Sequence, residues 1–267
     1  MRAGLVTAVW LCAGAALAQL SPYYITKGTS GLGTTYVMQS GVQQFNYAWA
    51  APGQMPIVIG NFGSGIRVRQ ACGQPTTGMP QQGDEYQTNG TPTGFTNFWN
   101  SGNPGATTAY DAGFNGTNIF MVHWLGTTDG QVFRYDNNYG NGTFLFNARS
   151  GDLGITYDSV DNSIWVSNWN DGRVTEYSLG GTQMSQFQAA GINVGALARD
   201  PLDDTFWMAI NSTAMLAQYS RTGTLLQSYA RPDYVLGGEI SAIPEPLTIF
   251  ALSAGIAALA FRRKKKA

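Results

Sequence analysis

Two stretches of the sequence, GITYDSVDNSIWVSNWNDGRVTEYSLGG at 154–181 and GALARDPLDDTFWMAINSTAMLAQYSRTG at 195–223, decide the fold because they repeat each other. Three kinds of residue recur at a spacing of 42 positions: Asp158 and Asp200, Trp165 and Trp207, and Tyr177 and Tyr219. A repeat of this length indicates an array of similar supersecondary units rather than a single irregular core.

A third copy precedes these two. DGQVFRYD at 129–136 matches DGRVTEYS at 171–178, again 42 residues later. Upstream of it, we expect Asp111 and Phe120 to correspond to Asp158 and Trp165, displaced by short loop insertions. The clear repeats are therefore 108–151, 152–193 and 194–236.

Each copy is composed of short strand-like segments separated by turns. An apolar stretch ends in an Asp-rich turn, and two strands follow, at 163–167 and 173–177 in the second copy. Alternating side chains and Asp-Gly or Asn-Gly pairs are typical of strands joined by tight turns. Four strands in roughly 42 residues are the unit of a β-propeller blade.

The best copy resembles the blades of NHL-type and YVTN-type propellers. The likeness rests on an aromatic-Val-x-Asn strand at 165–168 and a Val-x-x-Tyr-Ser-x-x-Gly strand at 174–181. It implies an all-β, β-propeller-like domain over residues 19–243. A β-sandwich of similar strands remains an alternative.

The remaining blades are less regular. Residues 19–107 are long enough for about two more, and we expect a long loop within the Gly-, Pro- and Thr-rich segment 73–107. GGEISAI at 237–243 resembles the start of a further copy. We expect Glu239 to Ile243 to supply an inner strand to the N-terminal blade, which closes a ring of five or six blades.

The first 18 residues carry the pattern of a secretory signal peptide. Arg2 precedes an apolar run, and small residues at positions 16 and 18 suit cleavage between Ala18 and Gln19. The domain is therefore expected to be exported.

The C-terminal residues 244–267 form a second signal in three parts. The triplet Pro244, Glu245 and Pro246 resists helix formation and is followed by 15 uncharged residues at 247–261. A helix of that length spans roughly 22 Å, less than a hydrocarbon core of about 30 Å. The tail 262–267 contains a cationic stop that favours the cytoplasmic side: Arg262, Arg263, Lys264, Lys265 and Lys266.

This order of triplet, apolar helix and basic tail resembles the PEP-CTERM sorting signal of Gram-negative bacteria. The resemblance implies processing by an exosortase at the inner membrane, transient anchoring there, and release to the cell surface or an exopolysaccharide matrix. An ordinary tail anchor is the alternative. The signal implies nothing about what the exported domain does.

Charge excludes one class of partner. All 16 acidic residues lie between Asp84 and Glu245, whereas only nine of the 15 cations lie between the two terminal signals. Such an acidic domain does not suit nucleic acid, which needs clustered Lys and Arg.

Once the signal peptide is removed, Cys72 is the only cysteine, so no internal disulfide can form. We expect the Cys72 side chain to be buried.

No residue pattern identifies a catalytic, cofactor or metal site. The repeated Asp111, Asp158 and Asp200 precede turns, where carboxylates bond nearby N–H groups, so we expect caps rather than metal ligands. His123 is the only histidine, which excludes a zinc site built on several histidines. We expect no cofactor and no metal.

Aromatic residues are the candidates for ligand contact. Trp99 lies in the irregular segment 73–107, and Trp124 and Trp169 occupy equivalent places after the second strand of their repeats. All three could stack on sugar faces at one rim, with core packing as the alternative. Trp165 and Trp207 are expected to pack between blades.

These observations favour an exported, non-enzymatic β-propeller with a structural role or a role in binding a glycan or a surface protein. The alternative is a propeller enzyme, a polysaccharide lyase or a lactonase-like hydrolase, that uses carboxylates in the central channel. Three or more polar or acidic side chains gathered at one mouth would favour the enzyme.

Overall fold

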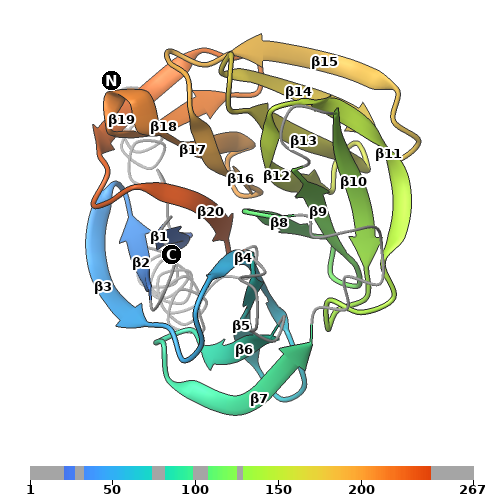
Figure 1. The fold of residues 1–267 in the computed structure, drawn as a ribbon. Helices are drawn as coiled ribbons and strands as arrows, with labels where there is room; N and C mark the ends of the chain where they lie inside the picture. Colours follow the sequence, from blue (N-terminus) through green and yellow to red (C-terminus); the bar gives the residue numbers. More distant parts are fainter. Residues whose placement is uncertain (1–20, 28–32, 74–81, 99–107, 125–128, 242–267) are drawn as a thin grey trace, which may run out of the picture.

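Every strand in the described part of the chain belongs to one of five four-stranded antiparallel sheets arranged around a central axis (Figure 1). The computed structural model describes residues 21–27, 33–73, 82–98, 108–124 and 129–241. The chain is thus a five-bladed β-propeller, which confirms the fold class expected from the repeats and sets the number of blades at five.

The blades follow one another along the chain, except that the first contains the last strand. From the centre outward, blade 1 contains β20 (Val235–Ile240), β1 (Tyr23–Lys27), β2 (Thr34–Gln39) and β3 (Val42–Ala48). Blade 2 contains β4 (Gln54–Asn61), β5 (Ile66–Cys72), β6 (Gln82–Gln87) and β7 (Pro92–Phe98). Blade 3 contains β8 (Ala112–Phe114), β9 (Ile119–His123), β10 (Asp129–Tyr135) and β11 (Thr143–Ser150).

The last two blades are the regular copies of the repeat. Blade 4 contains β12 (Asp152–Asp158), β13 (Ser163–Asn168), β14 (Arg173–Ser178) and β15 (Gln183–Gln188). Blade 5 contains β16 (Val194–Asp200), β17 (Thr205–Ile210), β18 (Met215–Ser220) and β19 (Leu225–Ala230), with the short 3-10 turn η1 (Asn211–Thr213) after β17. The 42-residue spacing extends to strand register, since Trp165 pairs with Glu176 and Trp207 with Gln218.

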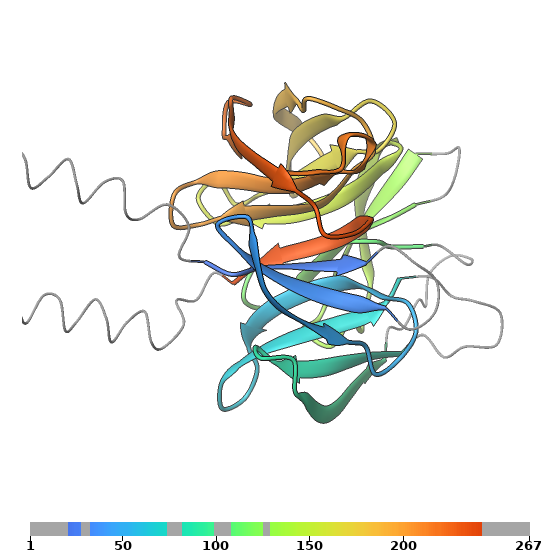
Figure 2. The ribbon, with the colours of Figure 1, turned by 90° about the vertical axis from the view of Figure 1, so that its left-hand side faces the viewer.

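The two ends of the described domain close the ring. β20 (red) pairs antiparallel with β1 (blue), as Figure 2 shows. In this pairing Tyr23 is the partner of Ile240. The inner strand expected from Glu239 onward is present, but it begins four residues earlier, at Val235. Ladder hydrogen bonds between the first and last strands hold the ring shut without a disulfide.

The segment 73–107 departs from expectation. Its described residues contain two strands, β6 and β7, which complete blade 2. The long loop that we expected within this segment does not include residues 82–98, and the rest of the segment after Gly73 lies outside the described residues. Strand β7 tolerates Gly and Thr residues because it is the outer strand of the blade, where no second layer of structure packs on it and apolar side chains are not required. Its composition therefore resembles that of a loop.

The core is divided among the junctions between neighbouring blades. Five apolar clusters fill the five junctions, and a sixth lies at one end of the channel. Trp165 packs in the junction between blades 4 and 5, and Trp207 in the junction between blades 5 and 1. Each ring is about 1 % exposed, and burying a side chain of this size contributes about 2–3 kcal/mol.

The inner strands all point the same way. Each blade has four antiparallel strands, so the chain leaves a blade at the end where it entered. The ring therefore has one end where β20, β4, β8, β12 and β16 begin and another where they finish. We call these the aromatic end and the pocket end, for the features described below.

Candidate functional site

A buried carboxylate, Asp111, joins four of the five inner strands at the centre of the ring. It is fully buried and accepts four backbone hydrogen bonds of 2.8–3.0 Å. The donors are the N–H groups of Ala112 in β8, Ile155 in β12, Leu197 in β16 and Gly238 in β20. Burial raises the pKa of Asp111 well above its usual value, while the four N–H donors act in the opposite direction.

The expected turn-capping role of Asp111 is wrong. Strand β8 has only three residues, so Asn115 takes the place that Asp158 holds in blade 4. The Asn115 side-chain oxygen accepts the N–H groups of Thr117 and Asn118, at 3.0 and 2.7 Å. Asp111 precedes the short strand and faces the channel instead.

The other two repeated carboxylates do cap turns, as expected. Asp158 accepts the N–H of Val160 at 2.8 Å, and Asp200 accepts that of Leu202 at 3.0 Å. Both side chains are buried. Burial raises the pKa of Asp200 to about 6. For Asp158 burial acts in the same direction, but the Val160 N–H and the guanidinium groups of Arg199 and Arg221 outweigh it and lower the pKa.

A cavity of about 300 Å³ opens at the pocket end, where the five inner strands finish. Glu239 of β20 lines it and is 6 % exposed. Its Oε1 accepts the N–H of Ile240 at 3.0 Å. Burial raises the pKa of Glu239 well above its usual value; the Ile240 N–H opposes this shift, and the nearby charge of Asp111 adds to it.

The walls of this cavity mix apolar and polar groups. Phe114 and Ile59 contribute apolar groups to the lining, and Asn115 and Ser159 contribute polar groups. Arg199 also lines the cavity, but its guanidinium is bound to Asp158 at 3.3 Å and to Asp204 at 2.7 Å. The cavity therefore presents one carboxylate and no unpaired cation.

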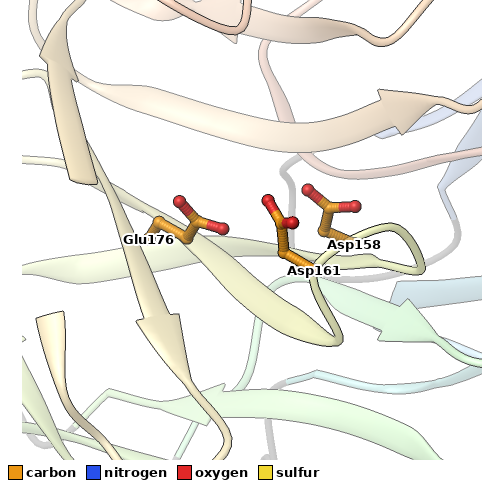
Figure 3. A group of neighbouring side chains, drawn as sticks. All are labelled: Asp158, Asp161 and Glu176. Atoms are coloured by element: carbon orange, nitrogen blue, oxygen red, sulfur yellow. The ribbon is translucent and has the colours of Figure 1, made fainter. Parts of the chain in front are cut away.

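Three carboxylates gather in a second place near the pocket end: Asp158, Asp161 and Glu176 (Figure 3). Their oxygens lie within 4.8 Å of one another, as metal ligands would. Arg221 occupies the middle of the group, however, with Nη1 2.5 Å from Asp158, Nη2 3.2 Å from Glu176, and a further contact to Asp161. The guanidinium supplies the positive charge that a cation would otherwise bring, so the cluster is a salt-bridge network between blades 4 and 5.

His123 lies inside the ring wall. It is the last residue of β9, is 1 % exposed, and contacts the Tyr135 hydroxyl at 2.6 Å through Nε2. Burial lowers its pKa to about 4. The pocket is not lined by His123.

Two of the three candidate tryptophans meet at the aromatic end. Trp124 and Trp169 are half-buried and pack against a cluster that closes the channel there: Trp49, Met55, Tyr110, Leu153 and Leu236. Trp169 also contacts Tyr234 edge to face, with ring centroids 5.9 Å apart, and Tyr234 is 37 % exposed. Trp124 and Trp169 thus lie at the same end of the ring. Each indole ring packs against the cluster on one side and remains partly exposed.

Several expected sites lie outside the described residues. They are Trp99, the cleavage residues Ala18 and Gln19, the triplet Pro244, Glu245 and Pro246, and the basic residues 262–266. Among the described residues, no helix has the length and apolar character needed to cross a membrane. Cys72 is buried in β5, as expected.

Sequence reasoning missed both carboxylates of the channel as site residues. Glu239 stands in the GGEISAI stretch that predicted the closing strand. The one available signal was the acidic side chain itself, placed in a strand whose six residues are all buried. A buried acid without a cationic partner points to a specific environment.

No protein-family model matches the chain, and no curated protein sequence matches it. Among solved structures, a chain of the nidogen/laminin complex is 10% identical with a TM-score of 0.53, and the match covers 84% of this chain and 99% of that one. Glutaminyl cyclase of Myxococcus xanthus is 12% identical over 67% of this chain and 71% of its own, with a TM-score of 0.48. Virginiamycin B lyase of Staphylococcus aureus is 16% identical over 80% and 71%, with a TM-score of 0.42. At 10% identity the first of these matches shows likeness of fold alone.

Proposed function

We propose that this chain is exported, sorted at the cell envelope through its C-terminal segment, and acts at the cell surface or in the extracellular matrix as a β-propeller that binds a glycan without cleaving it. The terminal signals expected from the sequence support export and sorting. The observation that supports glycan binding is the position of the chain ends relative to the exposed aromatic rings.

Both ends of the described domain lie at the pocket end. The N–H of Ser241 donates to the Pro22 carbonyl oxygen at 3.2 Å. Leu236, in the aromatic cluster, precedes Ser241 by five residues on the same inner strand, which corresponds to about 16 Å at about 3.3 Å per residue. The aromatic end is therefore directed away from the points where the terminal segments join the ring.

The exposed parts of Trp169 and Tyr234 suit a glycan. Aromatic rings present flat apolar faces with a polar group at the edge, which matches the C–H faces and hydroxyls of sugars. Arg231 lies over the Tyr234 ring at 5.4 Å and adds hydrogen-bond donors beside it. A partner approaching from outside would meet these three side chains together.

The pocket end gathers at least three polar or acidic side chains, including Glu239, Asn115 and Ser159, which by the criterion stated above favours an enzyme. The number of carboxyl groups, however, argues against a glycoside hydrolase. Most glycoside hydrolases use two carboxyl groups at the substrate. Here Asp111 is closed off by its four N–H donors, and Glu239 is the single carboxylate that lines the pocket. The raised pKa of Glu239 favours one second candidate, a lyase or lactonase-like propeller that uses this residue as a general acid or base.

The test is a combined binding and turnover assay of the full-length protein with exopolysaccharide from its source bacterium. Co-sedimentation should show binding, and Tyr234→Ala should weaken it at least tenfold. Leu202→Ala, which changes an exposed side chain at the opposite end, serves as the matched control and should bind normally. Release of sugar products by the wild type that is lost in Glu239→Gln would favour the enzyme. Absence of both binding and turnover would contradict the proposal that the ligand is a glycan.

Export and sorting are tested separately. Antibodies against the ring and against the basic tail 262–266 should detect the ring, but not the tail, on surface-located protein. An intact tail on that protein would contradict release by a sorting enzyme.

A further inference from the structure

One oxygen in the pocket lacks a donor. Glu239 is 6 % exposed; its Oε1 accepts the N–H of Ile240, whereas no described group donates to Oε2. Oε2 is not one of the fully enclosed polar atoms of the described residues that lack a partner, so it remains accessible from the cavity that Glu239 lines. The position suits an external donor that enters through the pocket.

The charges around the pocket favour a cation as that donor. The Arg199 side chain is 4 % exposed and already bound to two carboxylates, Asp158 and Asp204, so it offers no free positive charge to an anion. Asp111 lies deeper in the channel and adds negative potential at Glu239. An anionic ligand would meet repulsion from both carboxyl groups, whereas an ammonium group would compensate the charge that Glu239 carries once it has lost its proton.

The size and walls of the pocket limit the ligand further. About 300 Å³ is at the lower end of the range for small-molecule pockets. Phe114 forms an apolar wall, and Gly60 makes room for it, because a Cβ at that position would overlap the phenyl ring. Asn115 and Ser159 contribute polar groups to the lining, although the Asn115 side-chain oxygen already accepts two N–H groups. A compact ligand with both apolar C–H groups and hydroxyl groups fits this mixed lining.

We propose that the pocket binds a small primary amine of monosaccharide size, an amino sugar of the hexosamine class, with its ammonium group on Glu239 Oε2 and its hydroxyls toward Asn115 and Ser159. The ring face would rest on Phe114. This site lies at the opposite end of the ring from the aromatic residues of the proposed function, and it does not depend on that function.

Binding of this kind has a proton signature. Both oxygens of Asp111 accept N–H groups, which favours its ionised form, whereas burial raises the pKa of Glu239 and so favours its protonated form while the pocket is empty. The other titratable groups nearby are Tyr23, Tyr139, Tyr157 and Arg199, and burial raises the pKa of all three tyrosines. An ammonium ligand requires the ionised carboxylate, so it displaces this proton.

The experiment is calorimetric titration of the full-length protein with three sugars at neutral pH, in two buffers of different ionisation enthalpy. Glucosamine should bind with release of a proton, so its apparent enthalpy should differ between the buffers. Glucose and N-acetylglucosamine, which lack the charged amine, should bind at least tenfold more weakly. Equal binding of glucose and glucosamine, or no binding of glucosamine, would overturn the proposal.

Variants locate the site. Glu239→Gln keeps the shape and removes the charge, so glucosamine affinity should fall at least tenfold and the proton release should disappear. Asp203→Asn removes an exposed charge at the same end of the ring, outside the pocket, and should leave the glucosamine affinity and the proton release unchanged. Unchanged affinity in Glu239→Gln, or an equal loss in both variants, would contradict the assignment of Glu239.

Discussion

The backbone N–H of Gly238 donates a 2.8 Å hydrogen bond to Oδ1 of Asp111 across a sequence separation of 127 residues. Gly238 belongs to β20, the strand that closes the ring, and Asp111 precedes β8 in blade 3. The same carboxylate also accepts N–H groups from β12 and β16. One side chain therefore fixes the mutual approach of the inner strands, and its four bonds can all form only when the ring has closed.

Asp111→Asn should destabilise the protein strongly. An amide oxygen can accept two of the four N–H groups, but the NH₂ group is a donor and leaves the other two unsatisfied in a fully buried site. At about 1–3 kcal/mol for each buried group without a partner, the loss is about 2–6 kcal/mol. Urea unfolding at neutral pH measures it. Asp203→Asn, in an exposed turn, should change stability by less than about 1 kcal/mol, and equal losses in the two variants would refute the central role of Asp111.

The repeat could be predicted because its signals are local. A turn Asp, an aromatic residue in the second strand and a tyrosine in the third depend on neighbours within one blade, so Trp165 and Trp207 occupy equivalent register positions. The closing strand could be predicted for the same reason, since it resembles the start of another copy.

Asp111 and Glu239 show where such reasoning stops. The partners of Asp111 are backbone groups of other blades, which carry no sequence signature. Its alignment with Asp158 failed because β8 has three residues and β12 has seven. The pocket arises only where five strand ends meet, so no single repeat of the sequence indicates it.

Gly237→Ala should destabilise the ring closure. A Cβ at this position would lie 2.5 Å from the Tyr110 carbonyl oxygen and closer still to that of Met55. Both obstacles are backbone atoms, so β20 would have to move away from its neighbours, at a cost of about 1–3 kcal/mol. The melting temperature measures the effect. Gly180→Ala, whose nearest neighbour would be 3.8 Å away, is the matched control and should melt like the wild type; a normal melting temperature for Gly237→Ala would show that β20 tolerates displacement.

Arg221→Gln should destabilise the protein at neutral pH and much less in acid. Its guanidinium compensates four carboxylates, and without it Asp158 is buried with one cationic partner, Arg199, instead of two. The side chain is 25 % exposed, so the expected loss is about 1–3 kcal/mol, below that of a fully buried pair.

The pH dependence follows from the lowered pKa of Asp158. A carboxylate with a depressed pKa contributes stability above its unfolded pKa of about 3.9, and this contribution is lost as the pH falls through the folded value. The difference between wild type and Arg221→Gln should therefore shrink below about pH 4. Arg134→Gln, at an exposed position outside the ion pairs of the described residues, should show no such trend. A difference that is constant from pH 7 to pH 3 would mean that Arg221 acts through packing and not through charge.

His123 should remain neutral to an unusually low pH, and it should make the protein sensitive to acid. Its folded pKa of about 4 lies below the unfolded value of about 6.5, so the unfolded state binds the proton first and stability falls as the pH drops between these values, by up to about 3 kcal/mol. Asp152 and Asp200, whose pKa values burial raises to about 6, act in the opposite direction, so the wild-type curve alone does not isolate the histidine. Comparison with the variant His123→Gln isolates the effect of the histidine, because the glutamine amide can still accept the Tyr135 hydroxyl proton but does not titrate. The stability of wild type relative to His123→Gln should decline from pH 6.5 to pH 4, and because the chain has one histidine, a single imidazole NMR signal should stay at its neutral position down to about pH 5. A midpoint near 6.5 for that signal would show that the ring is solvated and that the burial of His123 does not control its charge.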